Sequence, residues 1–230
     1  MSVSSDLSVM PRGISPEHQL QRDAILQAAA EAFAERGYPA TTMAGLAGRL
    51  NVSKSLLYHY YPSKDAILFD LTAGYMRRLA TLVHEVEARA LPAQAALAEL
   101  VRRFVSEYES SRAVHIVLLN DVKYLPDEQR DEVLGLEREV VDAFARVIGG
   151  SHALDRAAAK VLTMCIFGMI NWTFTWLRPH GPVRYADFAE TVIGLIEGGL
   201  AQGAKRLEQR LNPQQEVDHE SHHGVMRTPH

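Results

Sequence analysis

Apolar residues recur at intervals of three and four positions along most of this 230-residue chain. In one such stretch Ile25, Ala28, Ala29, Ala32 and Phe33 fall on a single face of an α-helix. No segment shows the sustained two-residue alternation that a half-buried strand requires. We therefore predict an all-α fold without a sheet.

Three short helices are expected near the N-terminus, over residues 19–36, 43–50 and 54–60. Gly37 favours the end of the first helix. Thr41 or Thr42 can cap the second, and Ser53 can cap the third. The tight connection at Asn51-Val52 between the second and third helices is typical of a helix-turn-helix.

Longer helices follow, separated by proline and glycine residues, over residues 64–90, 92–110, 113–124, 127–148, 155–177 and 186–211. The predicted organisation is a flexible arm (1–17), a helix-turn-helix domain (18–64, with its motif at about 41–60), a helical ligand-binding and dimerisation domain (65–211), and a disordered, histidine-rich tail (212–230).

Charge is distributed unevenly along the chain. The net charge of −4 argues by itself against a nucleic-acid partner. From Arg36 to Lys64, however, the chain has four basic residues and no Asp or Glu. A locally basic segment on an acidic body suits a surface that binds phosphates, although a chance gap in acidic residues would give the same pattern.

The segment from Ala40 to Phe69, ATTMAGLAGRLNVSKSLLYHYYPSKDAILF, closely resembles the DNA-binding segment of the TetR family of regulators. The preceding ILQAAAEAFAERGY is similar to that family's first helix. The close resemblance covers about Arg22 to Leu71, and beyond it only the helical layout and total length agree. It implies a homodimer that binds a palindromic operator in double-stranded DNA.

The resemblance also implies DNA contacts, residue by residue. The positions that match the family's recognition helix are Lys54, Ser55, Leu56, Tyr58 and His59. Contacts to the DNA backbone are expected from Thr42, Ser53, Tyr60 and Lys64. Tyr58 could instead be a packing residue, Thr42 only a cap, and Lys64 a solvated lysine. Because the second helix carries Met43 and Ala44 where some relatives have longer polar groups, we expect base readout to depend on the third helix.

The predicted helix over 155–177 is apolar around most of its circumference. Its uncharged run, 161–177, is near the shortest that could span a bilayer, but the run is short, contains polar residues and stands alone. We expect burial on two sides instead of a membrane span. In the TetR family the last two long helices form the dimer interface, which here corresponds to 155–177 and 186–202. A continuous apolar stripe in the second of these is expected from Phe188, Val192, Leu195, Ile196, Gly199 and Leu200.

A cavity for a small hydrophobic effector is expected between the middle helices. Its candidate lining residues are Phe104, Tyr108, Leu119, Tyr124, Phe144, Met164, Phe167, Gly168, Asn171, Trp172 and Arg178. Most of these could equally be ordinary core residues. Asn171 is distinctive, because an amide inside an apolar helix needs a hydrogen-bond partner.

The string GMINWTFTWLRPHG, from Gly168 to Gly181, resembles the corresponding segment of TetR-type regulators that sense acyl-coenzyme A thioesters. The string LYHYY, at 57–61, is similar to that subgroup too. The resemblance implies a thioester of this kind as effector and no cofactor. Candidate basic groups for the coenzyme phosphates are Arg102, Arg103, Lys123, Arg130 and Arg178. A free aromatic or fatty acid would suit the same lining, as would a hydrophobic drug that controls an efflux or stress gene.

The expected function is that of a repressor released from its operator by this effector. A helical enzyme that binds acyl-coenzyme A is the remote alternative, but the chain has no glycine-rich phosphate loop and no G-x-S-x-G motif. No catalytic residue or metal site is expected, and His115, His152 and His180 are predicted to lie at the surface or to act as caps. The single Cys165 and the absence of an apolar leader favour a cytoplasmic protein.

Overall fold

The computed structural model describes residues 15–152 and 154–211, and within them it is helical throughout, with no strand. The all-α prediction is therefore confirmed. In chain order the helices are α1 (Pro16–Arg36), α2 (Met43–Arg49), α3 (Lys54–Tyr60), α4 (Lys64–Ala88), α5 (Ala93–Ser110), α6 (Arg112–Asp121), the short 3-10 helix η1 (Val122–Tyr124), α7 (Asp127–His152), α8 (Arg156–Asn171), α9 (Thr173–Trp176) and α10 (Tyr185–Leu211).

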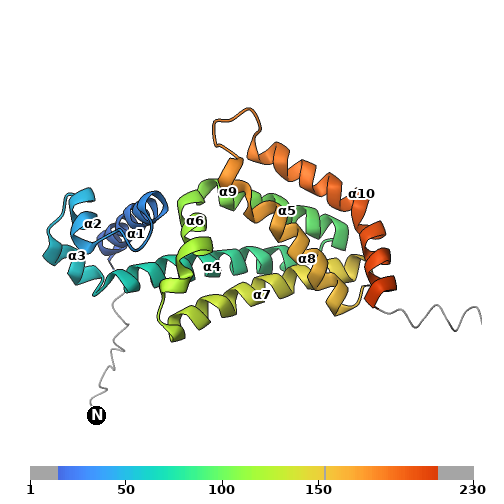
Figure 1. Cartoon of the computed structure of the whole chain (residues 1–230), viewed down its shortest axis with the longest axis horizontal. Helices are drawn as coiled ribbons and strands as arrows, with labels where there is room; N and C mark the ends of the chain where they lie inside the picture. The colour runs from blue at the N-terminus through green and yellow to red at the C-terminus, as the bar shows by residue number, and fades with distance from the viewer. Residues whose placement is uncertain (1–14, 153, 212–230) are drawn as a thin grey trace, which may run out of the picture.

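The helices form a small head and a larger body. Helices α1, α2 and α3 gather at one end of the molecule, and α5 to α10 make up a bundle at the other (Figure 1). Helix α4 belongs to both parts, because it starts beneath the head and continues through the bundle against α5 and α7. Helix α6 stands where the two parts meet, and it packs on α1 as well as on α4.

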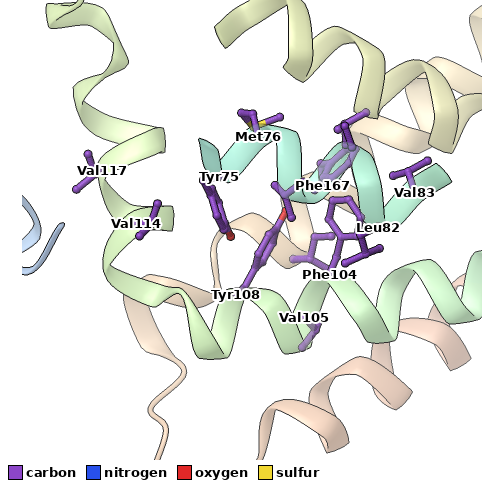
Figure 2. Packing of buried hydrophobic residues seen from close by; sticks show 14 of the residues in the cluster. Tyr75, Met76, Leu82, Val83, Phe104, Val105, Tyr108, Val114, Val117 and Phe167 are labelled. Carbon is purple, nitrogen blue, oxygen red and sulfur yellow. The ribbon is translucent and has the colours of Figure 1, made fainter. Parts of the chain in front are cut away.

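The core of the body is built from apolar faces with helical spacing. In α5 the buried positions follow steps of three and four residues through Leu97, Val101, Phe104 and Tyr108. Phe104 meets two further rings, Phe144 of α7 at 4.9 Å and Phe167 of α8 at 6.1 Å between centroids. Figure 2 shows Phe104 and Phe167 reaching into this shared interior from their separate helices.

The N-terminal helix starts earlier than predicted. The Ser15 side chain accepts a hydrogen bond from the backbone of His18, and Pro16 occupies the first helical position, where it needs no N–H donor. The last residues of the expected arm, 15–17, therefore belong to the start of α1. The rest of that arm, residues 1–14, and the expected disordered tail at 212–230 lie outside the described residues.

Two predicted helix ends in the body are wrong. Helix α7 continues through Gly149 and Gly150 to His152, because packing of α7 against α8 outweighs the roughly 1 kcal/mol that a glycine costs inside a helix. The helix predicted over 155–177 instead breaks at Trp172 into α8 and α9. The Thr173 hydroxyl bonds to the carbonyl of Ile170, which competes with regular helical bonding at this point.

Candidate DNA-binding surface and ligand cavity

Side-chain caps set the start of the two short helices in the head. Thr42 Oγ1 accepts a hydrogen bond from the backbone N–H of Gly45 at 3.0 Å, and Ser53 Oγ accepts one from Leu56 at 3.1 Å. Between them Asn51 takes a left-handed backbone conformation with φ of 53°, which asparagine tolerates better than most residues. Together these local features form a helix-turn-helix with α3 as its second helix.

Helix α3 is anchored by one residue and exposed on its other sides. Leu57 is fully buried in the core of the head. The exposed positions of the helix are Lys54, Ser55, Leu56, Tyr58 and His59. Tyr58 is 51% exposed, so it does not act as a packing residue in this structure. The five side chains named for base and phosphate contacts are thus all presented to solvent from one short helix.

The residues of the head that were expected to contact the DNA backbone differ in how far their side chains are already bonded within the protein. Thr42 and Ser53 are exposed, but their side-chain oxygens already act as caps. The Tyr60 ring is half-buried and packs against the rings of His18 at 4.6 Å and His59 at 5.5 Å. These residues can approach DNA, but each also stabilises the head itself.

Lys64 has a structural role that the sequence did not suggest. Its Nζ donates hydrogen bonds to the backbone carbonyls of Tyr38 at 2.8 Å and Thr41 at 2.9 Å. The same ammonium lies 4.0 Å from the centroid of the Tyr38 ring. The lysine is therefore neither a simple phosphate ligand nor a solvated side chain, because it holds the α1–α2 connection against α4.

Much of the positive charge of the head is paired within it. Arg49 of α2 bonds to Glu31 at 2.9 Å and to Glu35 at 2.8 Å, both on α1. The acid-free stretch found in the sequence is thus balanced by carboxylates that precede it in the chain. Lys54 remains as the exposed cation on α3.

A half-buried polar contact ties α1 to α4. Arg22 and the Tyr61 hydroxyl both bond to the Asp70 carboxylate, each at 2.5 Å. Burial, together with the hydrogen bond to Asp70, raises the pKa of Tyr61 to about 12, so the phenol stays protonated as a donor. This contact fixes the orientation of the head on the first turns of α4.

The body contains a cavity of about 340 Å³ bounded by α4, α5, α6, η1, α7 and α8. Most of its wall consists of methionine, leucine, valine and phenylalanine side chains. Its polar lining residues are Tyr108, His115, Lys123, Arg130, Glu137 and Asn171. An apolar chamber with a few convergent polar groups is the usual form of a small-molecule site.

The structure brings together six of the eleven residues proposed from the sequence as ligand contacts. These six line the cavity: Phe104, Tyr108, Leu119, Met164, Phe167 and Asn171. Gly168 and Trp172 lie outside it, along a more open depression that adjoins the cavity and shares Leu119, Met164, Phe167 and Asn171 with it. Phe144 is fully buried and supports the wall from behind through Phe104 and Phe167.

The other two proposed ligand contacts do not line the cavity either. Arg178 is exposed just after α9. Tyr124 faces the head instead, because its ring packs on Tyr38. The sequence could not separate these cases, since an aromatic residue at the end of a helix suits a cavity wall and an interdomain contact equally well.

The basic residues suggested for coenzyme phosphates fall into two groups. Arg102 pairs with Glu190 at 2.6 Å, and Arg103 pairs with Glu85 at 2.5 Å, in exposed bridges away from the cavity. Lys123 and Arg130 do line the cavity, near the end of α6 and the start of α7. Of the five candidates, only these last two are placed to meet a ligand inside the cavity.

His115 is the main functional candidate that the sequence analysis missed. It was expected at the surface, but it is 2% exposed and lines the cavity. Its ring stacks on Tyr108 at 3.9 Å, and its Nδ1 lies 3.5 Å from the hydroxyl of Tyr75. Tyr75 and Tyr108 extend into the same interior from α4 and α5 (Figure 2). Helical spacing gave a usable signal, since His115 shares a face with the apolar residues three and seven positions later.

Burial sets the chemistry of this polar cluster. It lowers the pKa of His115 to about 4, so the imidazole is neutral at neutral pH. The Tyr108 hydroxyl donates to Asn171 Oδ1 at 2.8 Å. This bond supplies the partner that an amide inside an apolar helix needs. The cluster therefore offers neutral hydrogen-bonding groups, not a charge, to whatever enters the cavity.

The end of α6 and η1 touches both the cavity and the head. Lys123 lines the cavity, whereas the ring of the next residue, Tyr124, stacks on Tyr38 with centroids 5.4 Å apart and an angle of 21° between planes. Asp121 is buried in the same contact, and burial raises its pKa against the opposing effects of Lys123, the Tyr38 backbone and Lys64. One short segment thus lies against both the cavity and the α1–α2 loop of the head.

Helices α8 and α10 carry apolar side chains that the single chain leaves exposed. On α8 the inward positions include Ile166 and Ile170, whereas Val161 is 44% and Met164 52% exposed. On α10 the expected continuous stripe is divided, because Val192 and Ile196 are buried while Leu195 is 61% exposed. The residues on the outer side are Val161, Met164, Cys165, Trp172 and Leu195. Side chains of the stripe at 200 and beyond lie outside what the structure describes.

One segment in the described part of the chain, Arg156–Trp176, is long and apolar enough to cross a membrane by length and composition. Core helices of soluble proteins meet the same criteria. This segment is interrupted at Trp172, and 39% of its most apolar window is buried within the chain.

The chain matches two family profiles. Residues 25–71 match that of bacterial regulatory proteins of the tetR family, and residues 90–200 match that of the tetracyclin repressor-like C-terminal domain. The first match covers most of α1, all of α2 and α3, and the start of α4. The second covers most of the body, including all of the cavity lining except Met76 and Leu79 of α4.

Three relatives agree with these matches. A TetR-family transcriptional regulator from Bordetella parapertussis, known from a crystal structure, is 33% identical in sequence to this chain. The match covers 76% of this chain and 93% of that chain, with a TM-score of 0.72. The HTH-type transcriptional repressor KstR2 of Rhodococcus jostii is 25% identical over 79% of this chain and 91% of its own length. The structure of AibR in complex with isovaleryl coenzyme A and operator DNA shares the fold, with 23% identity, a TM-score of 0.68, and coverage of 76% of this chain and 97% of AibR. The chain therefore belongs to the TetR family of DNA-binding transcriptional regulators.

Proposed function

We propose that this chain is a dimeric repressor that is released from its operator when an acyl-coenzyme A thioester occupies the cavity of the body. The observation that carries the proposal is the position of α6 and η1, which form part of the cavity wall and also contact α1 of the head. A ligand that displaces this segment has a direct physical connection to the DNA-binding helices.

Operator recognition is assigned to the exposed side of α3. Lys54 can bond to a guanine edge or to a phosphate, and the hydroxyl of Tyr58 can donate to a phosphate while its ring contacts a thymine methyl. Leu57 supports both residues from the core, so each can be changed without removing the anchor of the helix. Thr42, Ser53 and Tyr60 are assigned to the DNA backbone beside these contacts.

A homodimer is assigned to the outer face of α8 and α10. The outer sides of these helices leave Val161, Cys165 and Leu195 exposed, and two chains could bury these side chains against each other. At Gly194, Gly198 and Gly199 a Cβ atom would meet nothing within 4 Å outside the helix's own backbone, so this side of α10 would permit close approach of a second copy. A two-fold dimer would present two α3 helices to the half-sites of a palindrome.

The thioester proposal is supported by the size and lining of the cavity. At about 340 Å³ it lies at the lower end of ligand pockets, which range from roughly 300 to 1,000 Å³. It would accept an acyl group, while the larger coenzyme would extend outward past Lys123, which is exposed. The complex of AibR with isovaleryl coenzyme A provides a precedent within the same fold.

Release follows from linkage between the two sites. The effector weakens DNA binding only to the extent that it prefers a conformation in which the two α3 helices no longer fit the operator. In the proposed mechanism the acyl group moves α6 and η1, and the contact with α1 transmits this movement to the head.

The proposal is tested by a gel-shift titration of the purified protein on DNA upstream of its own gene. The titration is repeated with phenylacetyl, isovaleryl and long-chain acyl-coenzyme A and with the matching free acids. We expect tight, salt-sensitive binding that a thioester reverses and its free acid does not. Lys54→Ala is the matched control, because it should bind the DNA more weakly while its affinity for the effector is unchanged.

Two results would contradict separate parts of the proposal. If DNA binds but no thioester releases it, the effector assignment is wrong. If neither this DNA nor any sequence selected from a random library binds, the assignment of α3 to an operator is wrong.

A further inference from the structure

We propose that His115 donates a hydrogen bond from Nε2 to an uncharged carbonyl oxygen of the effector, and so selects carbonyl compounds over the corresponding carboxylates. The inference rests on the proposed function in one respect, namely that the cavity of the body is the effector site. It adds which protein atom recognises the ligand and which chemical group that atom requires.

The first observation is a buried polar atom without a partner. Within the part of the chain that the structure describes, His115 Nε2 is buried and forms no hydrogen bond of good geometry, although the backbone of Asn171 is near enough to raise the pKa of the ring against the effect of burial. Buried polar atoms in folded proteins nearly always have a partner, and an exception calls for a physical reason. Because His115 lines the cavity, a ligand in that cavity can supply the missing partner.

The second observation concerns the position of the imidazole proton. The buried hydroxyl of Tyr75 faces His115 Nδ1 at 3.5 Å. Burial raises the pKa of Tyr75, so the hydroxyl keeps its proton and can donate it to Nδ1. In that arrangement the Tyr75 hydroxyl donates to Nδ1, and the single proton of the neutral imidazole is on Nε2. The opposite tautomer would leave the Tyr75 proton and the Nε2 lone pair unsatisfied, so the structure favours Nε2–H as a donor.

A second donor lies in the same wall. Asn171 Oδ1 already accepts from the Tyr108 hydroxyl. Among the described residues, its Nδ2 amide has no hydrogen-bond acceptor. Tyr108 also stacks on His115, so the two donor-bearing side chains are held by one tyrosine. Donors without acceptors define a subsite for an oxygen that accepts hydrogen bonds.

The charge of the subsite decides which kind of oxygen fits. His115 is neutral because burial lowers its pKa to about 4. The cationic lining residue on the same segment, Lys123, lies eight positions further along the chain, or about 12 Å at the rise of an α-helix. The other cation of the lining, Arg130, is paired with Asp127 at 2.8 Å. The charge of Glu137, also in the lining, acts on Tyr108 beside His115. A carboxylate at His115 would therefore be buried without a free cation beside it and toward another carboxylate, at a large desolvation cost. A thioester, ester or ketone carbonyl accepts the same hydrogen bond without that cost.

The test compares ligands that differ only in this oxygen. Isothermal titration calorimetry measures the affinity of the full-length protein for hexanoyl-coenzyme A and for S-hexyl-coenzyme A, a thioether that lacks the carbonyl oxygen. We expect the thioester to bind the wild-type protein about tenfold more tightly, the difference typical of one hydrogen bond to a neutral group. Equal affinities in the wild-type protein would overturn the inference without recourse to any variant.

Two variants then assign the effect to His115. His115→Phe keeps a ring that can pack on Tyr108 but removes the hydrogen-bond donor. The affinity of this variant for the thioester should therefore fall to its affinity for the thioether, and its affinity for the thioether should equal that of the wild-type protein. In His115→Gln a donor is retained, and part of the tenfold preference should return. A preference that survives unchanged in His115→Phe would place the carbonyl contact elsewhere. Thermal unfolding of both variants shows whether they are folded.

Two further measurements separate this inference from the thioester proposal. Undecan-2-one, undecane and undecanoate carry no coenzyme, so a His115-dependent preference for the ketone would support the inference even if no thioester bound. Conversely, release of DNA by thioesters with no dependence on His115 would overturn it and leave the proposed function intact. Failure of every carbonyl probe to bind would also overturn the inference.

The position of the imidazole proton can be measured directly. In ¹⁵N NMR of the wild-type protein the His115 imidazole should carry its proton on Nε2, and a proton on Nδ1 would contradict the assignment.

Discussion

Tyr124, at the end of η1, stacks on Tyr38, the residue that follows the glycine ending α1. Lys64 lies over the Tyr38 ring, and the Tyr38 hydroxyl donates to Asp65 at the start of α4. Tyr38 is thus held from the body on one side and from the first turn of α4 on the other. Because the residue before Tyr124 lines the cavity, the stack connects the cavity wall to the head, beside the direct packing of α6 on α1.

We predict that Tyr124→Ala weakens communication between the two sites. An aromatic pair contributes about 0.5–1.5 kcal/mol, so the effector-induced loss of operator affinity should shrink by about two- to twelvefold. Affinity for the effector, measured by calorimetry, and for DNA without effector, measured by gel shift, should change little. Tyr124→Phe preserves the ring and serves as the control. Full release of Tyr124→Ala by the effector would show that the signal travels by another route.

Lys54→Ala should reduce operator affinity and lower its dependence on salt. Removing one phosphate contact decreases the slope of log K against log salt by about one. The slope is measured by fluorescence anisotropy over a range of salt concentrations. Circular dichroism should be unchanged, because Lys54 is exposed. An unaltered slope together with reduced affinity would mean that Lys54 reads a base and not a phosphate.

Leu195→Glu should convert the protein to a monomer and abolish operator binding. Leu195 is 61% exposed in the single chain, so the substitution is compatible with folding, but a charge buried at an apolar interface is costly. Sedimentation velocity measures the mass. Leu20→Glu places the same charge on a residue that is 69% exposed on α1 and should remain dimeric. A dimeric Leu195→Glu protein would locate the interface away from this face.

Acid should destabilise the wild-type protein more than His115→Gln. Burial lowers the pKa of His115 from 6.5 to about 4, so below pH 6.5 the unfolded chain binds a proton that the folded protein does not. This contribution to stability is present above about pH 6.5 and is lost as the pH falls toward 4, by about 2–3 kcal/mol. Urea unfolding gives the free energy of unfolding of each protein at pH 7.5 and at pH 4.5. The fall in this free energy between the two pH values should be about 2–3 kcal/mol larger for the wild-type protein than for His115→Gln. Equal losses would show that His115 is not a buried neutral histidine.

The sequence predicted the helical fold because its main signals are local. Spacing of apolar residues, the capping oxygens of Thr42 and Ser53, and the turn at Asn51 each act within a few residues. The two wrong helix ends had non-local causes. Gly149 lies inside a helix that packing sustains, and the break at Trp172 depends on contacts made by its neighbours.

The candidate site could be predicted only in part, because a cavity depends on how faces from several helices are spaced. The prediction for Asn171 identified a residue whose amide had to find a partner, and it lines the cavity. His115 was not identified because histidine is intermediate between the buried and the exposed residue types, so its type alone does not predict burial. Tyr124 and Lys64 were assigned to ligand and DNA respectively, whereas both contact Tyr38. Nothing in the local sequence distinguishes a domain contact from a ligand contact.

The ion pairs of Arg49 with Glu31 and Glu35 also bear on how the protein searches a chromosome. Attraction to random DNA depends on the number of unpaired cations that can displace counterions. With Arg49 paired and Lys64 bonded to backbone carbonyls, this head has fewer cations to offer at arbitrary positions. We therefore expect weak nonspecific binding to unrelated DNA sequences. A small number of copies per cell would then keep the operator occupied.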